Sequence, residues 1–176
     1  IDDLGVSYIE GGWPGSNPRD EEFFDEARKL NLRNAKLAAF GATRRAGIRC
    51  EQDANLQALL RSQVSVLTIF GKCWRFQATE ALRISAEENL ELIEDSVRYL
   101  KGEVPEVVFD AEHFFDGYRD DPEYALACLA AAARGGADWL ALCDTNGGSL
   151  THEVADAVAH ALRVTGKPIG IHTHND

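Results

Sequence analysis

The stretch PIGIHTHND, residues 168–176, joins a short apolar run to a cluster of polar residues. If the run is a β-strand, side chains two positions apart point to the same face of the sheet. His172 and His174 then project together, and two imidazoles on one face can bind one metal ion. The pair is equally compatible with two histidines that are partly buried and hydrogen-bonded without a metal.

The pattern of an apolar run followed by polar residues recurs along the chain about every 30 residues, with one longer interval. The runs are short and nearly continuous, which is typical of strands in a parallel sheet that is covered by helices. We expect six strands, at residues 6–10, 35–40, 64–70, 106–111, 137–143 and 169–171.

Segments with apolar residues at helical spacing alternate with these strands, which predicts five helices. A short polar side chain precedes several of the apolar stripes and suits the N-terminal cap of a helix. We expect such caps at Asp20, Ser85, Asp121 and Thr151. The alternation of strands and helices indicates an α/β fold.

Two α/β folds compete for this pattern, a (β/α)8 TIM barrel and a doubly wound sheet. A closed barrel needs about 250 residues, or roughly 31 per unit, so the spacing fits an incomplete barrel that lacks two units. A doubly wound sheet usually carries a glycine-rich phosphate turn after its first strand. The sequence has no GxGxxG motif, which favours the barrel.

Polar residues at the strand ends also favour the barrel, because the carboxyl ends of all barrel strands open on one mouth. They are Glu10, Thr43, Arg44, Lys72, Glu112, Asp144, Thr145, His172 and His174. We therefore expect residues 1–176 to form a single partial TIM-barrel catalytic domain. The remaining strands are expected to lie outside this sequence.

The formal net charge of −11 argues against a nucleic-acid partner or an anionic membrane, since both require a basic face. An enzyme of small metabolites fits this acidic composition better. The four cysteines form no CxxC pair, and the plain interpretation is buried thiols in a reducing cytoplasm. The chain also has no apolar run of the roughly 20 residues that a membrane span needs. We expect a cytoplasmic protein.

The candidate residues also have simpler explanations. Asp110 and Glu112 share a face of their strand, and such a pair is often bound in an ion pair to a neighbouring strand. Asp144 begins a DTNGG segment that is compatible with a tight turn, although the flanking helices exclude a hairpin. Arg44 and Lys72 can be solvated loop charges.

Taken together, the residues suggest metal-assisted chemistry. Imidazoles suit zinc, manganese, cobalt or iron, and added carboxylates also admit magnesium. A divalent ion with open positions can bind a 2-oxo acid through its keto and carboxylate oxygens and polarise the carbonyl. A nearby Glu or Asp can then transfer protons.

Four motifs occur in order along the chain: YIEGGWPGSNP at 8–18, DAEHFFDGY at 110–118, LCDTNGG at 142–148 and IHTHND at 171–176. Together they resemble the citramalate synthase branch of the 2-isopropylmalate synthase and HMG-CoA lyase superfamily. The resemblance extends over nearly the whole chain and implies a TIM barrel, with the six strands as barrel strands 2 to 7. The first strand and the last βα unit are then expected outside this sequence.

The resemblance implies that His172 and His174 bind a divalent metal ion (Mg, Mn or Zn), together with an aspartate from the first strand and an asparagine beyond the seventh. It also implies a Claisen condensation of acetyl-CoA, as co-substrate, with a 2-oxo acid. For this branch the 2-oxo acid is pyruvate and the product is citramalate. A homodimer is expected.

The resemblance also implies roles for single residues. Glu112, Asp144 and Glu10 are expected to be catalytic, with Glu112 against the metal and its water. Thr145 is expected to bind the substrate carboxylate, and Arg44 and Lys72 are the other substrate-binding candidates. Phe40, Phe70 and Trp74 are candidates to limit the size of the substrate. Gln77 stands where the branch tends to have a histidine.

Three other functions remain open at this point. One is a 2-isopropylmalate or homocitrate synthase that takes a longer 2-oxo acid. Another is cleavage of the HMG-CoA lyase or aldolase type, because addition and cleavage share one transition state. The last is an inert piece of a barrel that lacks the arginine and the aspartate ligand of the family's Thr-Leu-Arg-Asp-Gly strand.

Overall fold

The computed structural model describes residues 1–174, in which six parallel strands form one sheet. The strands are β1 (Tyr8–Glu10), β2 (Lys36–Ala42), β3 (Val66–Lys72), β4 (Glu106–Glu112), β5 (Trp139–Asp144) and β6 (Ile169–Thr173). Each strand pairs with the one before it in the chain, so the order is β1-β2-β3-β4-β5-β6. The order of a doubly wound sheet reverses at a switch point, whereas that of a barrel does not. The fold is therefore a partial TIM barrel, as predicted.

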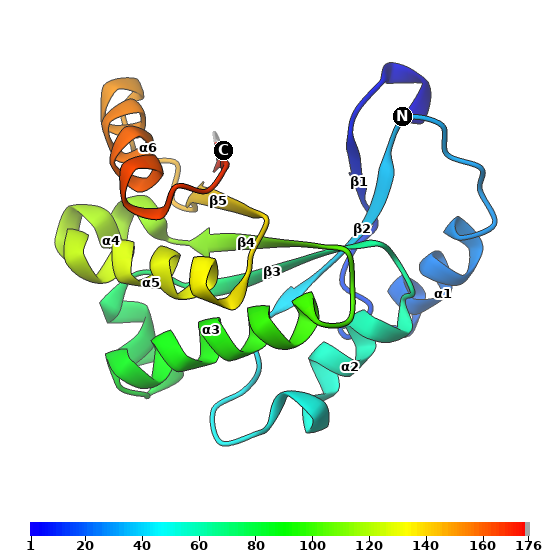
Figure 1. Cartoon of the computed structure of the whole chain (residues 1–176), viewed down its shortest axis with the longest axis horizontal. Helices are drawn as coiled ribbons and strands as arrows, with labels where there is room; N and C mark the ends of the chain where they lie inside the picture. Colours follow the sequence, from blue (N-terminus) through cyan, green and yellow to red (C-terminus); the bar gives the residue numbers. More distant parts are fainter. Residues whose placement is uncertain (175–176) are drawn as a thin grey trace.

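Helices connect the strands and lie on the convex side of the curled sheet (Figure 1). They are α1 (Pro18–Ala27), α2 (Ala54–Arg61), α3 (Ala86–Lys101), α4 (Phe114–Asp120), α5 (Pro122–Gly135) and α6 (Thr151–Thr165). Short helical turns occur at Asp2–Leu4, Cys50–Gln52 and Gln77–Leu82, the last of them a π-helix. The sequence analysis predicted neither α4 nor the π-helix.

The apolar core lies between the sheet and the helices. Residues that are aligned in a parallel register point to the same face of a sheet. Leu67 pairs with Val107, and Phe109 pairs with Leu140, and all four side chains are completely buried on the convex face. The concave face, which becomes the interior of a barrel, carries the polar residues instead.

Two of the four predicted helix caps are correct. The Ser85 side chain accepts a hydrogen bond from the Glu88 amide at the start of α3. The Asp121 side chain accepts one from the Tyr124 amide at the start of α5. Each satisfies an amide that has no partner within its helix.

The other two predicted caps are wrong. The N-cap of α1 is Asn17, whose side chain accepts a hydrogen bond from the Asp20 amide, while the Asp20 carboxylate accepts from the amide of Trp13. Helix α6 begins at Thr151 itself, and Leu150 is its N-cap. In both cases the helix starts earlier than predicted.

Polar contacts on the concave face join the amino ends of the strands around Glu106. Its carboxylate accepts hydrogen bonds from the Tyr8 hydroxyl and the Trp139 indole, and Lys36 Nζ lies 2.6 Å from it. Burial by itself raises the pKa of Glu106, but the hydrogen bonds from Lys36 and Tyr8 outweigh it and hold the pKa below its ordinary value. This cluster joins β1, β2, β4 and β5 at the end of the sheet opposite the mouth.

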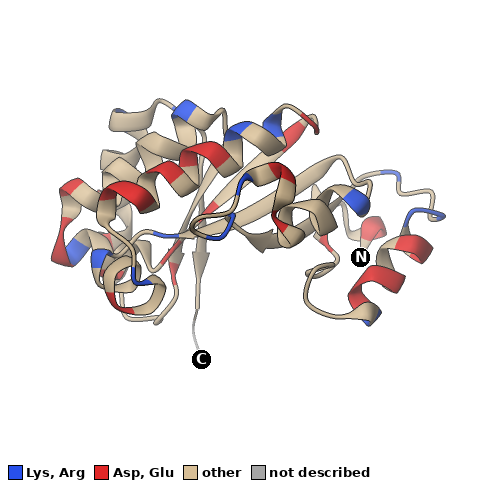
Figure 2. Cartoon of the chain, turned by 90° about the horizontal axis from the view of Figure 1, so that it is seen from below, with Lys and Arg blue, Asp and Glu red and all other residues tan. Residues whose placement is uncertain are grey.

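Many of the acidic residues lie on the helices (Figure 2). Within residues 1–174, none of the helices combines the length and the apolar character that a membrane crossing requires. All four cysteines are buried free thiols, as the sequence predicted.

Candidate active site

The carboxyl ends of the strands form a pocket of about 280 Å³ on the concave face. Its lining comes from β2 to β6 and the segments that follow them: Phe40, Phe70, Asp110, Glu112, Cys143, Thr145, His172 and His174. Four of the predicted site residues therefore meet in one place: Glu112, Thr145, His172 and His174. The parallel register explains this, since it aligns Phe70 with Asp110 and Cys143 with His172.

The two histidines lie on the same face, as their spacing predicted. Their ring centroids are 4.8 Å apart, with 22° between the ring planes. His172 belongs to β6, and His174 follows the end of that strand. Residues 175 and 176, which complete the IHTHND motif, lie outside the described residues.

Asp110 also lines this pocket. The sequence analysis considered it as a partner of Glu112 on one face of the strand but did not include it among the expected site residues. Its Oδ2 lies 3.8 Å from His172 Nδ1, and potential ligand atoms of Asp110, Cys143 and His172 all lie within 4.8 Å of one another. Burial raises the pKa of Asp110, and the neighbouring His172 opposes this. The sequence feature that could have identified Asp110 as a site residue is its spacing of two positions from Glu112, which places both side chains on one face of β4.

The donor atoms in this pocket fit a divalent cation. Imidazole nitrogens and carboxylate oxygens are the usual ligands of Zn²⁺ and Mn²⁺, and carboxylates also suit Mg²⁺. Cys143 is a poorer donor, because burial and the neighbouring Asp110 raise the pKa of its thiol. His172 and His174 are therefore the candidate ligands, and the Asp110 carboxylate lies close enough to His172 to share a metal ion with it or to restrain its ring.

Glu112 and Lys72 form an ion pair beside the pocket. The Lys72 ammonium lies 2.6 Å from a Glu112 carboxylate oxygen, and both side chains are mostly buried. The two residues are aligned in the register of β3 and β4, so their side chains leave the sheet on the same face. Lys72 thus neutralises a carboxylate at the site, which was one of the alternatives that the sequence left open.

Glu10 lies on the edge strand β1 and lines a neighbouring pocket on the concave face, which Asp110 also lines. Partial burial raises the pKa of Glu10, and the carboxylate of Asp110 raises it further. The structure therefore places Glu10 next to the site, across Asp110, rather than in the pocket with the histidines. Its catalytic role stays a prediction.

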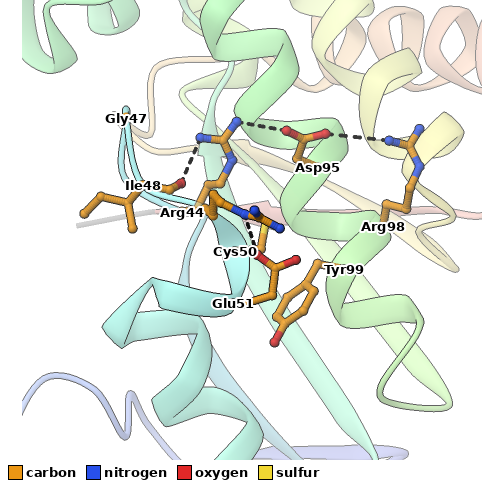
Figure 3. A pocket seen from close by; sticks show the side chains of 9 residues that line it. Arg44, Gly47, Ile48, Cys50, Glu51, Asp95, Arg98 and Tyr99 are labelled. Carbon is orange, nitrogen blue, oxygen red and sulfur yellow. Dashed lines mark hydrogen bonds and ion pairs between the residues drawn. The ribbon is translucent and has the colours of Figure 1, made fainter.

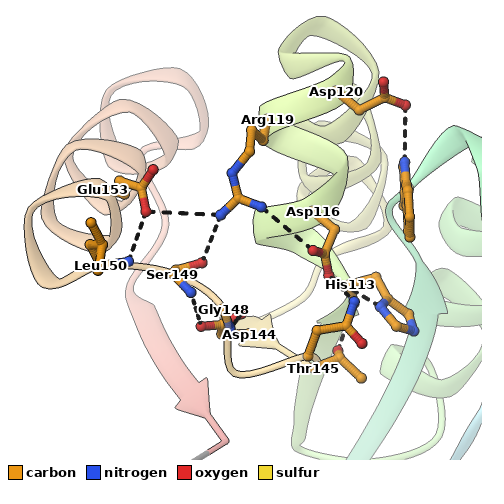
Figure 4. A network of polar contacts seen from close by, with 12 residues as sticks. His113, Asp116, Arg119, Asp120, Asp144, Thr145, Gly148, Ser149, Leu150 and Glu153 are labelled. Atoms are coloured by element: carbon orange, nitrogen blue, oxygen red, sulfur yellow. Dashed lines mark hydrogen bonds and ion pairs between the residues drawn. The ribbon is translucent and has the colours of Figure 1, made fainter.

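Asp144 does not point into the pocket. It alternates with Cys143 along β5, so its side chain leaves the convex face, where it is buried. Its two carboxylate oxygens accept hydrogen bonds from the backbone amides of Gly148 and Ser149 (Figure 4). In this arrangement Asp144 shapes the loop after β5, which corrects our expectation that it faces the pocket.

Arg44 also lies away from this pocket. It lines a separate pocket between the loop after β2 and helix α3, where its guanidinium is 2.9 Å from Asp95 and donates to the Ile48 carbonyl (Figure 3). Its backbone amide donates to the Ser96 hydroxyl on the same helix. These contacts hold Arg44 against α3, so the structure does not bring it to the candidate substrate site.

Two of the three aromatic residues expected to limit substrate size line the pocket. Phe40 and Phe70 stack with ring centroids 5.3 Å apart, and Trp13 packs edge-on against both rings. Trp74 is directed elsewhere, because its indole donates to Asp120 on α4. Gln77, the position that departs from the citramalate synthase branch, begins the π-helix after β3.

The curled parallel sheet, with imidazoles and carboxylates gathered at the carboxyl ends of its strands, defines a β/α-barrel protein whose candidate site lies at the barrel mouth. The sequence profile of the HMGL-like family matches residues 1–176. The chain belongs to this family.

The chain is 54% identical over 176 residues to an (R)-citramalate synthase of Geobacter sulfurreducens and 52% identical over 177 residues to one of Aquifex aeolicus. The matches cover 100% of this chain but 33% and 34% of those proteins, so the chain spans about a third of their length. Among solved structures, the hydroxymethylglutaryl-CoA lyase of Pseudomonas aeruginosa is similar with a TM-score of 0.74 at 17% identity. That match covers 99% of this chain and 58% of the lyase chain, and it supports the barrel fold.

Proposed function

We propose that the protein condenses acetyl-CoA with a 2-oxo acid, most favourably pyruvate, to give citramalate. The observation that carries this proposal is the pocket in which Glu112, Thr145, His172 and His174 meet. The identity of 54% to an (R)-citramalate synthase supports it. The buried free thiols are compatible with a protein of the cytoplasm.

In this proposal, His172 and His174 hold a divalent metal ion, Mg, Mn or Zn. Such an ion supplies a Lewis acid that polarises the keto group of the 2-oxo acid. The Thr145 hydroxyl binds the carboxylate of the 2-oxo acid. Phe40 and Phe70 pack beside that position and favour a small substituent, which is the reason to place pyruvate before longer 2-oxo acids.

The reaction needs a base that removes a proton from the acetyl methyl group and an acid that protonates the new alkoxide. The resulting enolate forms a carbon–carbon bond to the keto carbon, and water then hydrolyses the thioester and releases CoA. Glu112 and Glu10 are the carboxylates that we propose for these proton transfers. The ion pair with Lys72, at 2.6 Å, holds the Glu112 carboxylate beside the pocket.

Release of free CoA from acetyl-CoA and pyruvate tests the proposal. We expect it to require a divalent metal ion and to fall by at least about 100-fold in a His172→Ala, His174→Ala double variant. His152→Ala is a matched control, because His152 is exposed on α6. A double variant as active as the wild-type protein would contradict the proposal.

Two further assays separate the competing functions. Faster turnover with a branched or longer 2-oxo acid than with pyruvate would indicate a 2-isopropylmalate or homocitrate synthase. Formation of acetoacetate from HMG-CoA would indicate a lyase. The barrel fold alone does not decide between them, because one fold hosts many activities.

A further inference from the structure

A polar network joins the corner after β4 to the loop after β5, just outside the pocket (Figure 4). The first segment carries Glu112 and His113, and the second carries Thr145 and Asn146. Both segments supply residues to the candidate site, so any contact that fixes them to each other also fixes the geometry of the pocket. Asp116 on α4 makes these contacts.

The Asp116 carboxylate binds three partners. Asn146 Nδ2 donates to it at 2.9 Å, His113 Nδ1 lies 3.3 Å away, and an Arg119 guanidinium nitrogen lies 3.7 Å away. Only 14% of the Asp116 side chain is exposed, so water competes weakly for these contacts. One carboxylate therefore connects helix α4, the β4 corner and the β5 loop.

His113 has an unusual backbone conformation that the network supports. Its φ of 56° lies in the left-handed region, which non-glycine residues rarely adopt without support from their surroundings. In this conformation the His113 amide donates a hydrogen bond of 2.9 Å to Thr145 Oγ1. The strained residue thus forms a direct link between the segments that carry Glu112 and Thr145.

This hydrogen bond orients the Thr145 hydroxyl, because one side of its oxygen faces the His113 amide. A hydroxyl has one hydrogen to donate and lone pairs that accept. Because the His113 amide occupies a lone pair, the hydrogen of Thr145 is left to donate elsewhere. An anionic oxygen in the pocket, such as a carboxylate, is the acceptor that suits it best.

We propose that Asp116 is a positioning residue that fixes Thr145, through His113 and Asn146, for the carboxylate of the 2-oxo acid. This inference rests on the proposed function. Asp116 does not line the pocket, so its effect on the reaction is carried by Thr145.

A double-mutant cycle of Asp116→Ala and Thr145→Val tests this coupling. In the Asp116→Ala variant we expect the KM for the 2-oxo acid to rise about 10-fold while the KM for acetyl-CoA stays unchanged. On the Thr145→Val background the same change should have less than about a 2-fold effect, because the hydroxyl that it positions is gone. Independent effects that multiply would overturn the proposal.

Glu123→Ala is the matched control. Glu123 is an exposed carboxylate in the first turn of α5, the helix that follows α4. We expect it to leave the KM for the 2-oxo acid unchanged. If Asp116→Ala fails to fold, Asn146→Ala removes one link of the network from an exposed side chain and should raise the same KM by a smaller factor.

Hydrogen exchange gives a readout that does not depend on activity. We expect the His113 amide to exchange faster in Asp116→Ala and in Thr145→Val, and at the wild-type rate in Glu123→Ala. An unchanged rate in Asp116→Ala would overturn the proposed link. A wild-type protein without condensation activity would overturn the proposed function, whereas an active protein with an additive cycle would overturn only the role of Asp116.

Discussion

Gly117, in the middle of α4, packs against the backbone that follows β3. A Cβ atom at this position would lie 2.2 Å from the Cys73 carbonyl oxygen and 2.8 Å from the Trp74 Cα. Both atoms belong to the backbone, so no side-chain rotation relieves the contact. A Gly117→Ala substitution therefore forces α4 away from the sheet.

The size of this effect follows from the geometry. Ordinary contacts start at 3.4 Å, so the helix has to move by about 1.2 Å, the difference from 2.2 Å. Alanine in a helix interior is favoured over glycine by about 1 kcal/mol. Overpacking costs about 1–3 kcal/mol and sometimes more, and a backbone clash of this kind belongs at the upper end. We expect a net loss of about 2 kcal/mol in the free energy of unfolding.

Urea unfolding followed by circular dichroism measures this loss. Gly148→Ala is the control, since an added Cβ there meets nothing within 4 Å. Because α4 carries Asp116, we also expect Gly117→Ala to raise the KM for the 2-oxo acid. A Gly117→Ala protein as stable as the wild type, or more stable, would refute the close approach of α4 to Cys73.

Two further predictions concern carboxylates on the concave face of the sheet. The pKa of Glu106 is lowered on folding, so its stabilisation is complete above the ordinary glutamate pKa of about 4.3 and is lost as the pH falls through the folded value. We expect Glu106→Gln to lower the free energy of unfolding by about 1 kcal/mol at pH 7 and to match the wild type in acid. Urea unfolding at a series of pH values measures this difference. A loss of stability that persists in acid would contradict the prediction. We expect Asp110→Asn to weaken divalent metal binding about 10- to 100-fold by calorimetry, because the Asp110 carboxylate lies 3.8 Å from the candidate ligand His172. Affinity equal to that of Asp156→Asn, an exposed control on α6, would exclude that role.

The sequence predicted the positions of all six strands because their apolar runs are short and separated by helices. It also predicted the shared face of His172 and His174, since the period of a strand fixes this locally. On β4 the alternation of charged and apolar residues indicated which face is polar, because Asp110 and Glu112 are two positions apart. These features depend only on neighbours in the chain.

The direction of the Asp144 side chain could not be predicted from neighbouring residues. Both faces of β5 carry apolar residues, so the sequence does not reveal which face Asp144 occupies. The position of Arg44 could not be predicted for another reason. Its partner Asp95 lies 51 positions away in the chain, and no local pattern connects the two residues. Helix α4 was missed because HFFDGYRD is short and contains a glycine, so its helical state depends on packing against other elements.

The position of the apolar core on the convex face has a consequence for how this scaffold can change. The side chains that hold sheet and helices together are separate from those that line the pocket. Phe40 and Phe70 can therefore be exchanged for smaller residues without opening a cavity in that core, which would enlarge the space available to a substrate. Protein engineers can thus vary the aromatic residues of the pocket while leaving the core between the sheet and the helices unchanged.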